Sequence, residues 1–232
     1  MGQKLALHQV DLEYFWKTLG SQNVRVLSDA MTWLENQFFA YWQDKTDREQ
    51  LKIGLEICPK HLHRLIFEGK LVGKPFVWTD YRPSSLPHES LKLEDTNQYW
   101  LIECVLAIFA SVPTYEKLLE DNRWRYTDTL KILHRGLTLT PEQEGLWNFL
   151  LKGRPLSDEK IVNTYQYYGH LTNFELKVFL DGLNSFYAEM QGRPEDETPM
   201  NWQTIAYEDF EHIYNDLSKA LDNNLDLFFM IT

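Results

Sequence analysis

The feature that most constrains this chain is the apolar segment Tyr99–Ala110. Apolar side chains would occupy every side of a helix built from this segment, which is typical of a helix buried all round inside a protein. Its most apolar part, residues 105–110, is far shorter than the roughly 20 residues that cross a bilayer. We therefore predict a central buried helix that begins at Asp95 or Thr96 and ends before Pro113.

Amphipathic helices are predicted before and after this segment. Apolar residues recur at three- and four-residue spacings from Val24 to Trp42, which indicates one buried stripe. Capping boxes indicate helix starts at Thr46 and Thr172, and Thr140 followed by proline indicates another. The remaining helices are predicted at residues 12–19 (capped by Asp11), 59–69, 115–120, 124–134 and 207–221.

Short strands are predicted at the two ends of the chain, around Leu5 and Leu7 and over residues 225–231. Neither strand has a local hairpin partner, so we expect them to pair with each other or with a strand in the region 70–80. The sequence therefore predicts an α+β fold, predominantly helical, with many helices around a small sheet that includes the N- and C-terminal strands. Because no stretch resembles a linker between two cores, we expect a single globular domain over residues 1–232.

Two stretches, residues 70–94 and 154–169, lack clear periodicity and are predicted to be irregular. Long loops of this kind are often functional. Aromatic side chains beside arginine and aspartate resemble a recognition surface, but large rings in a loop can also anchor it on the core. Both alternatives stay open for the four candidate binding residues of the first stretch, which are Trp78, Asp80, Tyr81 and Arg82.

The charge balance disfavours two classes of partner. The chain has 23 Lys and Arg against 34 Asp and Glu, a formal net charge of −11. Such a surface repels phosphate backbones and anionic lipid, so we expect no nucleic-acid partner and no membrane. The only two cysteines, Cys58 and Cys104, form no disulfide framework, and no signal peptide opens the chain. These features predict a cytoplasmic protein.

One carboxylate, Glu103, interrupts the most apolar segment. A buried carboxylate is costly unless it is paired or neutralised, and its pKa is often raised into the range that suits acid/base chemistry. Trp100 lies one helical turn before it and could line an adjoining cleft. The structural alternative, which the sequence favours, is that Glu103 pairs with a helix end or an arginine and only fixes packing. Glu103 is therefore the one, weak candidate for a catalytic residue.

His170 lies just before the helix start at Thr172. A helix N-terminus attracts anions, so His170 is a candidate binding residue, and the alternative is a histidine that simply lies in the turn. Cys58, His61 and His63 have a metal-like composition, but a helix would not direct all three to one point. A zinc site needs three or four ligands. We therefore predict no metal site and no cofactor.

Four segments, which together cover about a third of the chain, resemble parts of one known family. They are the opening strand with Asp11-Leu12 and a helix ending Leu19-Gly20-Ser21, the helix at Trp100-Leu101-Ile102-Glu103, the run Gly169-His170-Leu171-Thr172 with Glu175 and Leu176, and the close Asn223-Asn224-Leu225-Asp226-Leu227. In these features and their order the chain resembles bacterial proteins of the YfbM type and their larger relatives, a family with a domain of unknown function. Residues 70–94 depart from the family's pattern. The resemblance implies an α+β fold and no established activity.

Two functions follow from these observations. We favour a non-catalytic cytoplasmic protein that binds another protein, of the immunity or accessory kind, because the surface is acidic and the first irregular stretch is rich in aromatics. No nucleophile elbow, phosphate-binding loop, dinucleotide fingerprint or zinc-protease motif occurs. The alternative is a small-molecule-binding hydrolase or transferase that uses Glu103 as acid or base. A small-molecule ligand belongs only to this alternative.

Overall fold

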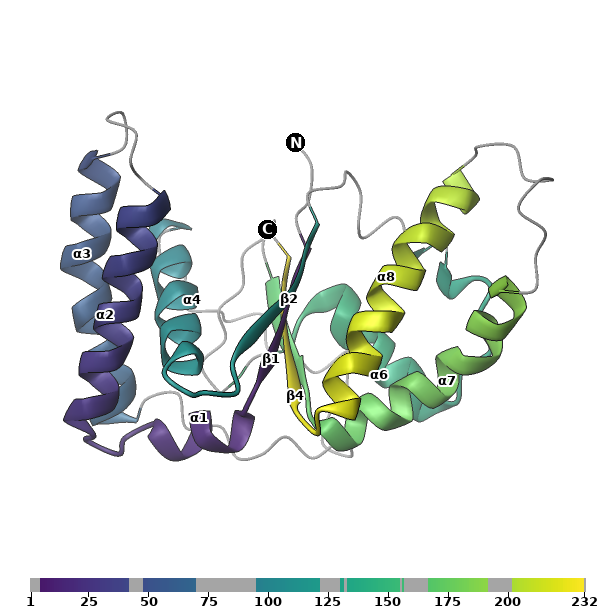
Figure 1. The fold of residues 1–232 in the computed structure, drawn as a ribbon, viewed down its shortest axis with the longest axis horizontal. Helices are drawn as coiled ribbons and strands as arrows, with labels where there is room; N and C mark the ends of the chain where they lie inside the picture. Colours follow the sequence, from purple (N-terminus) through teal and green to yellow (C-terminus); the bar gives the residue numbers. More distant parts are fainter. Residues whose placement is uncertain are drawn as a thin grey trace.

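The structure is a computed structural model that describes residues 5–41, 48–69, 95–121, 130–131, 133–154, 156, 167–191 and 202–231. In this part of the chain, a four-stranded sheet lies between two layers of helices (Figure 1). The predicted α+β, mostly helical fold is confirmed, and so is the inclusion of both terminal strands in the sheet. No helix within the described residues combines the length and the apolar character that a membrane span requires.

The sheet consists of β1 (Leu5–Val10), β2 (Glu116–Asp121), β3 (Tyr167–Leu171) and β4 (Asp226–Ile231), in the order β2-β1-β4-β3. All neighbouring strands are antiparallel. The terminal strands β1 and β4 pair with each other in the middle of the sheet, which is one of the two pairings that the sequence leaves open. Their other edges are covered by β2 and β3, so both terminal strands are protected from pairing with other chains.

One face of the sheet is covered by α1 (Leu12–Thr18), α2 (Val24–Tyr41), α3 (Arg48–His63), the π-helical turn η2 (Arg64–Glu68) and α4 (Asp95–Ala110). We call this layer the α1–α4 side. Helix α4 packs against α2 and α3 and is buried along most of its described length, because apolar residues surround it. The predicted central buried helix is confirmed.

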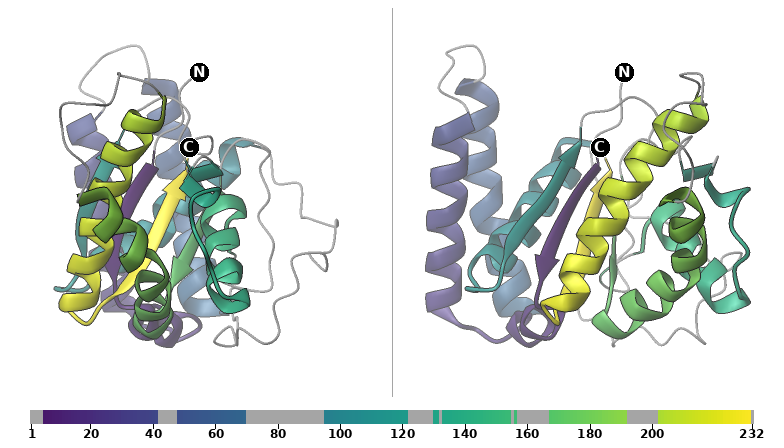
Figure 2. Two further views of the ribbon diagram at one scale, coloured as in Figure 1. Left: turned by 90° about the vertical axis from the view of Figure 1, so that its right-hand side faces the viewer. Right: turned by 45° about the vertical axis from the view of Figure 1, so that its right-hand side comes forward.

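The opposite face is covered by α6 (Pro141–Lys152), α7 (Asn173–Gln191), α8 (Trp202–Asp222) and the helical residues 130–134 that are described. We call this layer the α6–α8 side, and Figure 2 shows the sheet between the two layers. Successive residues of a strand point to opposite faces, so Phe228 of β4 belongs to the core of the α1–α4 side and Phe229 to that of the α6–α8 side. The sheet therefore contributes side chains to the hydrophobic core on each of its two faces.

The predicted helix starts at Asp11, Thr140 and Thr172 are confirmed, whereas Thr46 lies outside the described residues. The Asp11 side chain accepts a hydrogen bond from the Tyr14 N–H at 2.8 Å and so caps α1. A complete capping box of Thr140 and Gln143 begins α6. At the other end of a helix, Gly69 has the left-handed conformation (φ 62°) that ends η2, as the sequence predicts.

Several sequence predictions are wrong. Residues 116–121 form strand β2 rather than part of a helix over 115–120, because they pair with the open edge of β1. Pro59 lies inside α3 instead of starting a new helix, and Tyr167–Leu171 is a strand where the irregular stretch 154–169 was predicted to end. Helix α8 begins at Trp202, earlier than predicted.

Candidate functional site

Glu103, the candidate acid/base residue, lies half-buried on α4 near the start of β2. Tyr115, just before β2, has its pKa raised mainly by burial and secondly by the nearby Glu103 carboxylate. The Tyr115 hydroxyl is hydrogen-bonded to Nδ1 of His8 in β1 at 3.0 Å. Three titratable side chains from α4, β1 and the segment before β2 therefore gather on the α1–α4 side.

His8 and Tyr115 form an uncharged pair. His8 is 3% exposed, and burial lowers its pKa to about 4, so it is neutral at pH 7. Its Nε2 contacts no hydrogen-bond partner within the described residues. The raised pKa of Tyr115 keeps the phenol protonated. A neutral Tyr–His pair near a carboxylate can hold or pass a proton, which is the chemistry this cluster offers.

An apolar hollow lies between α4 and the sheet, on the same side as Glu103. It is lined by Leu101, Ile102, Val105, Tyr168 and Phe228, and it is too narrow to admit a water molecule. Glu103 does not line it. This hollow therefore offers no space where a substrate could meet the Glu103 carboxylate.

Trp100, the predicted neighbour of Glu103 in a cleft, packs into the interface between α3 and α4. It is 2% exposed. A Cβ atom at Gly54 of α3 would lie 2.5 Å from Trp100 Cη2, so glycine at this position makes room for the ring. The structure therefore places Trp100 against α3, where it fixes helix packing.

His170, the candidate anion-binding residue, lies in strand β3 and is 1% exposed. The alternative of a histidine in the turn is wrong, because the strand continues through Leu171 before α7 begins. The ring lies edge-on to Trp16 of α1, with centroids 5.8 Å apart, and neither ring nitrogen meets a hydrogen-bond partner within the described part of the chain. Burial and then the charge of Arg154 lower its pKa, so the imidazole is neutral.

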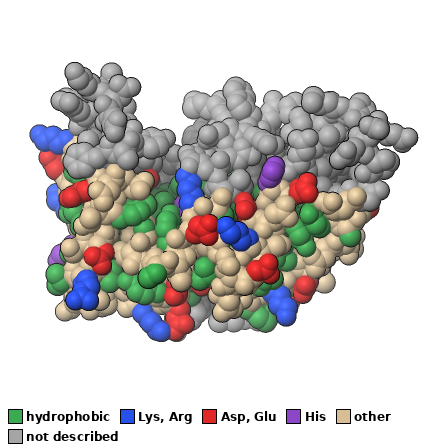
Figure 3. Space-filling model, viewed as in Figure 1, with side chains coloured by type: hydrophobic (Ala, Val, Ile, Leu, Met, Phe, Trp, Pro, Cys, Tyr) green, Lys and Arg blue, Asp and Glu red, His purple; other side chains and the backbone are tan. Residues whose placement is uncertain are grey.

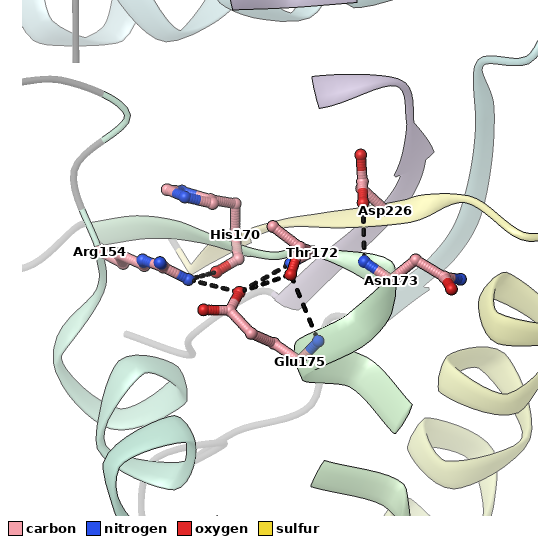
Figure 4. A network of polar contacts seen from close by, with 6 residues as sticks. All are labelled: Arg154, His170, Thr172, Asn173, Glu175 and Asp226. Atoms are coloured by element: carbon pink, nitrogen blue, oxygen red, sulfur yellow. Dashed lines mark hydrogen bonds and ion pairs between the residues drawn. The ribbon is translucent and has the colours of Figure 1, made fainter. Parts of the chain in front are cut away.

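A buried ion pair that the sequence did not indicate lies beside the start of α7 (Figure 4). The Arg154 Nη1 donates to Glu175 Oε2 at 2.8 Å and to the His170 carbonyl at 3.3 Å. The same Glu175 oxygen accepts from the N–H and the hydroxyl of Thr172. The Thr172 hydroxyl oxygen in turn accepts from the Glu175 N–H at 3.3 Å, so the predicted capping box is confirmed. Arg154 is 1% exposed and its guanidinium lies over the Phe149 ring. The network fixes the 153–154 segment to β3 and α7.

One carboxylate, Asp226 at the start of β4, caps two helices. Its Oδ2 accepts from the Leu12 N–H of α1 at 3.0 Å, and its Oδ1 accepts from the Asn173 N–H of α7 at 2.7 Å (Figure 4). Burial raises the pKa of Asp226, while these two hydrogen bonds oppose the shift. Asp226 therefore joins a helix of the α1–α4 side to a helix of the α6–α8 side.

The remaining sequence candidates do not converge on this region. Cys58 faces α4, whereas the His63 ring stacks on Phe67 with centroids 4.5 Å apart. No group of three potential metal ligands occurs within the described residues. The loop candidates Trp78, Asp80, Tyr81 and Arg82 lie outside the described residues.

A pair of stacked tyrosines bridges α7 and α8 at the surface. The rings of Tyr187 and Tyr214 lie 4.0 Å apart and within 10° of parallel. The Tyr187 hydroxyl donates to Asn215 at 3.5 Å, and the Tyr214 hydroxyl donates to Asn184. Both asparagines are exposed and both rings are partly exposed. This tyrosine pair is a rigid aromatic surface with polar groups at its edges.

Comparisons with known families, with curated proteins and with solved structures find no match to this chain. The resemblance to YfbM-type proteins therefore stays a prediction.

Proposed function

We propose that this chain is a non-catalytic cytoplasmic protein that acts by binding another protein. The observation that carries the proposal is the tyrosine pair of Tyr187 and Tyr214. Tyrosine is enriched at protein interfaces because it offers a large contact area with few torsions to immobilise. Here stacking and the two hydrogen bonds to asparagine already hold the rings in place, so little side-chain entropy is left to lose on binding.

The separation of the catalytic candidate Glu103 from the binding candidates Trp100 and His170 supports the same proposal. Trp100 packs against α3, His170 lies on the sheet beneath α1, and Glu103 lies apart from the hollow beside α4. A catalytic site needs its acid, base and substrate-binding groups within hydrogen-bond reach of one space. The described candidates share no such space, which favours binding over catalysis. The immunity or accessory kind of role, and kinship with YfbM-type proteins, belong to this proposal.

Surface charge does not by itself select the partner. Figure 3 shows acidic and basic side chains interspersed over the described part of one face. The formal net charge of −11 nevertheless disfavours nucleic acid and anionic lipid. A protein partner fits both observations.

The test is affinity capture from a lysate of the source cells, with four forms of the full chain as bait. They are the unaltered chain, Tyr187→Ser with Tyr214→Ser, Trp78→Ala with Tyr81→Ala, and the control Glu35→Ala with Asn36→Ala, which changes exposed residues of α2 at the far end of the molecule. We expect the unaltered chain and the control to recover the same stoichiometric protein. The tyrosine variant should recover at least tenfold less. Circular dichroism checks that each bait is folded.

Two outcomes would contradict the proposal. One is repeated recovery of no stoichiometric protein by the unaltered chain. The other is equal recovery by all four baits, which would show that neither the tyrosine pair nor Trp78 and Tyr81 takes part in binding.

One observation favours the alternative function, a small-molecule hydrolase or transferase. Glu103, Tyr115 and His8 form a cluster of titratable groups in an otherwise apolar layer, and such clusters are frequent at active sites. The test is a thermal-shift screen of small metabolites against the unaltered chain and Glu103→Gln. A ligand that raises the Tm of the unaltered chain but not of Glu103→Gln, and is then turned over, would establish this alternative. A screen that finds no such ligand would rule out the hydrolase or transferase alternative.

A further inference from the structure

The fold brings the only two cysteines of the chain together. Cys58 of α3 and Cys104 of α4 are 46 residues apart in sequence, and the Cys104 thiol donates to the Cys58 carbonyl at 3.5 Å. The Cys58 thiol donates to the Trp100 carbonyl at 3.9 Å. It is also close enough to Cys104 to raise the pKa of the Cys104 thiol. Both cysteines are reduced and buried, at 1% and 0% exposed. Each thiol therefore contacts the backbone of the other helix within one α3–α4 interface.

Close packing holds the two helices in this register. The same offset of 46 residues that separates the cysteines also separates Gly54 from Trp100, one turn earlier on each helix. At that turn the Trp100 ring occupies the space of the missing Gly54 side chain. A disulfide requires the Cα atoms of two residues to lie within about 7 Å with their Cβ atoms facing. The Cys104 sulfur lies 3.5 Å from the Cys58 carbonyl oxygen, so the two residues are direct neighbours in this interface.

The helix that carries Cys58 contains weak points next to the sulfur. Pro59 lies inside α3 and has no N–H to donate to the preceding turn. Five residues further along the chain, α3 ends and the π-helical turn η2 begins at Arg64. Segments with missing or irregular backbone hydrogen bonds open more readily than regular helix. Local opening here would admit a small neutral oxidant to the thiols.

We propose that Cys58 and Cys104 are a peroxide-responsive pair that forms an internal disulfide between α3 and α4. The Cys58 sulfur attacks one oxygen of hydrogen peroxide, the O–O bond breaks, and the released hydroxide takes the thiol proton as water. The resulting sulfenic acid is attacked by the Cys104 sulfur, the S–O bond breaks, and a second water leaves with the Cys104 proton. One peroxide is reduced to two waters while the two thiols are oxidised to one disulfide.

The order of the two cysteines follows from their surroundings. Burial, and then the neighbouring Cys58 thiol, raise the pKa of Cys104 well above its usual value. A sulfur that resists ionisation is the poorer first nucleophile, since the thiolate is the reactive form. Cys58 also adjoins Pro59, where α3 lacks a backbone hydrogen bond, so we assign the first attack to Cys58.

The test is mass spectrometry of the full chain after exposure to hydrogen peroxide. We expect the loss of two hydrogens, about 2 Da, and of both alkylatable thiols, with full reversal by dithiothreitol. A peptide that joins Cys58 to Cys104 should appear after digestion. The oxidised chain should keep its circular dichroism spectrum and gain on the order of 5 to 10 °C in Tm, because the bond closes a loop between packed helices.

Variants test the order of reaction. Cys104→Ala should accumulate a sulfenic acid at Cys58 that dimedone traps, whereas Cys58→Ala should give little dimedone adduct. If either variant fails to fold, the measurements on the unaltered chain still decide the question. Retention of both thiols, oxidation beyond sulfenic acid without a link, disulfide-bonded dimers, or a lower Tm after oxidation would each overturn the proposal.

Discussion

On the α6–α8 side of the sheet, the buried guanidinium of Arg154 lies 2.8 Å from a carboxylate oxygen of Glu175. On the α1–α4 side, His8 and His170 lie in one cross-strand row, each opposite Phe228 of β4, and they carry ring nitrogens without described partners. The α6–α8 side therefore contains a buried ion pair, Arg154 with Glu175. The α1–α4 side contains two buried histidines that burial keeps neutral.

This difference has energetic consequences. A paired charge depends on its partner, because removal of one member leaves the other buried and uncompensated. A neutral histidine depends on pH, since acid offers it a proton that only the unfolded state accepts readily. The α6–α8 side should therefore be sensitive to substitution of the pair, and the α1–α4 side to acid.

The largest effect is expected from Arg154→Met, which leaves the Glu175 carboxylate buried without its cation. We expect a loss of about 3–5 kcal/mol in the free energy of unfolding, measured by urea denaturation at pH 7. The double variant Arg154→Met with Glu175→Gln should recover part of this loss, because both charges are then gone. A single variant as stable as the unaltered chain would show that the pair carries no buried charge.

Acid should act mainly on the α1–α4 side. The pKa of His8 is lowered from 6.5 to about 4, so the unfolded chain binds a proton at a higher pH than the folded chain. Stability is therefore unaffected by this group above pH 6.5 and falls as pH drops towards 4, by roughly 3 kcal/mol in total. His8→Gln should flatten this pH dependence by that amount. Parallel curves for the two chains, measured by urea denaturation, would refute the expectation.

Two glycines allow a matched comparison of packing. A Cβ atom at Gly169 would lie 2.3 Å from Phe229 Cζ and 2.8 Å from the Arg154 backbone nitrogen, whereas the three atoms nearest to one at Gly54 all belong to the Trp100 ring. Gly169→Ala should cost about 1–3 kcal/mol, because backbone on one side cannot give way. Gly54→Ala should cost less. A reversed order in thermal denaturation would mean that the α3–α4 interface is the more rigid one.

The smallest effects are expected at the two matched helix caps. Asp11 caps α1 on one side of the sheet and Thr140 caps α6 on the other. Replacement of either by alanine should cost about 1 kcal/mol. If the two sides unfold together, both substitutions should lower the same single transition. A cap substitution that shifts only part of the unfolding signal would indicate two separate transitions.

The sequence predicts those elements whose signals are local. The buried helix α4 follows from its composition, and the starts of α1, α6 and α7 follow from Asp11, Thr140 and Thr172. Strand β2 could not be predicted, because its sequence Glu-Lys-Leu-Leu-Glu-Asp consists largely of good helix formers and becomes a strand by pairing with β1.

The candidate site was less predictable because its contacts are distant in sequence. His170 follows a glycine and precedes a helix, which suggests a turn, yet Gly169 is needed in the strand because Phe229 fills the space of its side chain. Tyr115 and His8 are 107 residues apart, and Arg154 and Glu175 are 21 apart. Only the chain's tertiary pairing brings these groups together.

We expect the terminal strands β1 and β4, which contribute to both cores, to make the two sides one cooperative unit. Hydrogen–deuterium exchange of peptides from α4 and α7, followed over increasing urea concentration, tests it most directly. Both peptides should lose protection at the same urea concentration, together with β1 and β4. Loss of protection in α4 while α7 stays protected, or the reverse, would show two independently unfolding bodies and contradict the account.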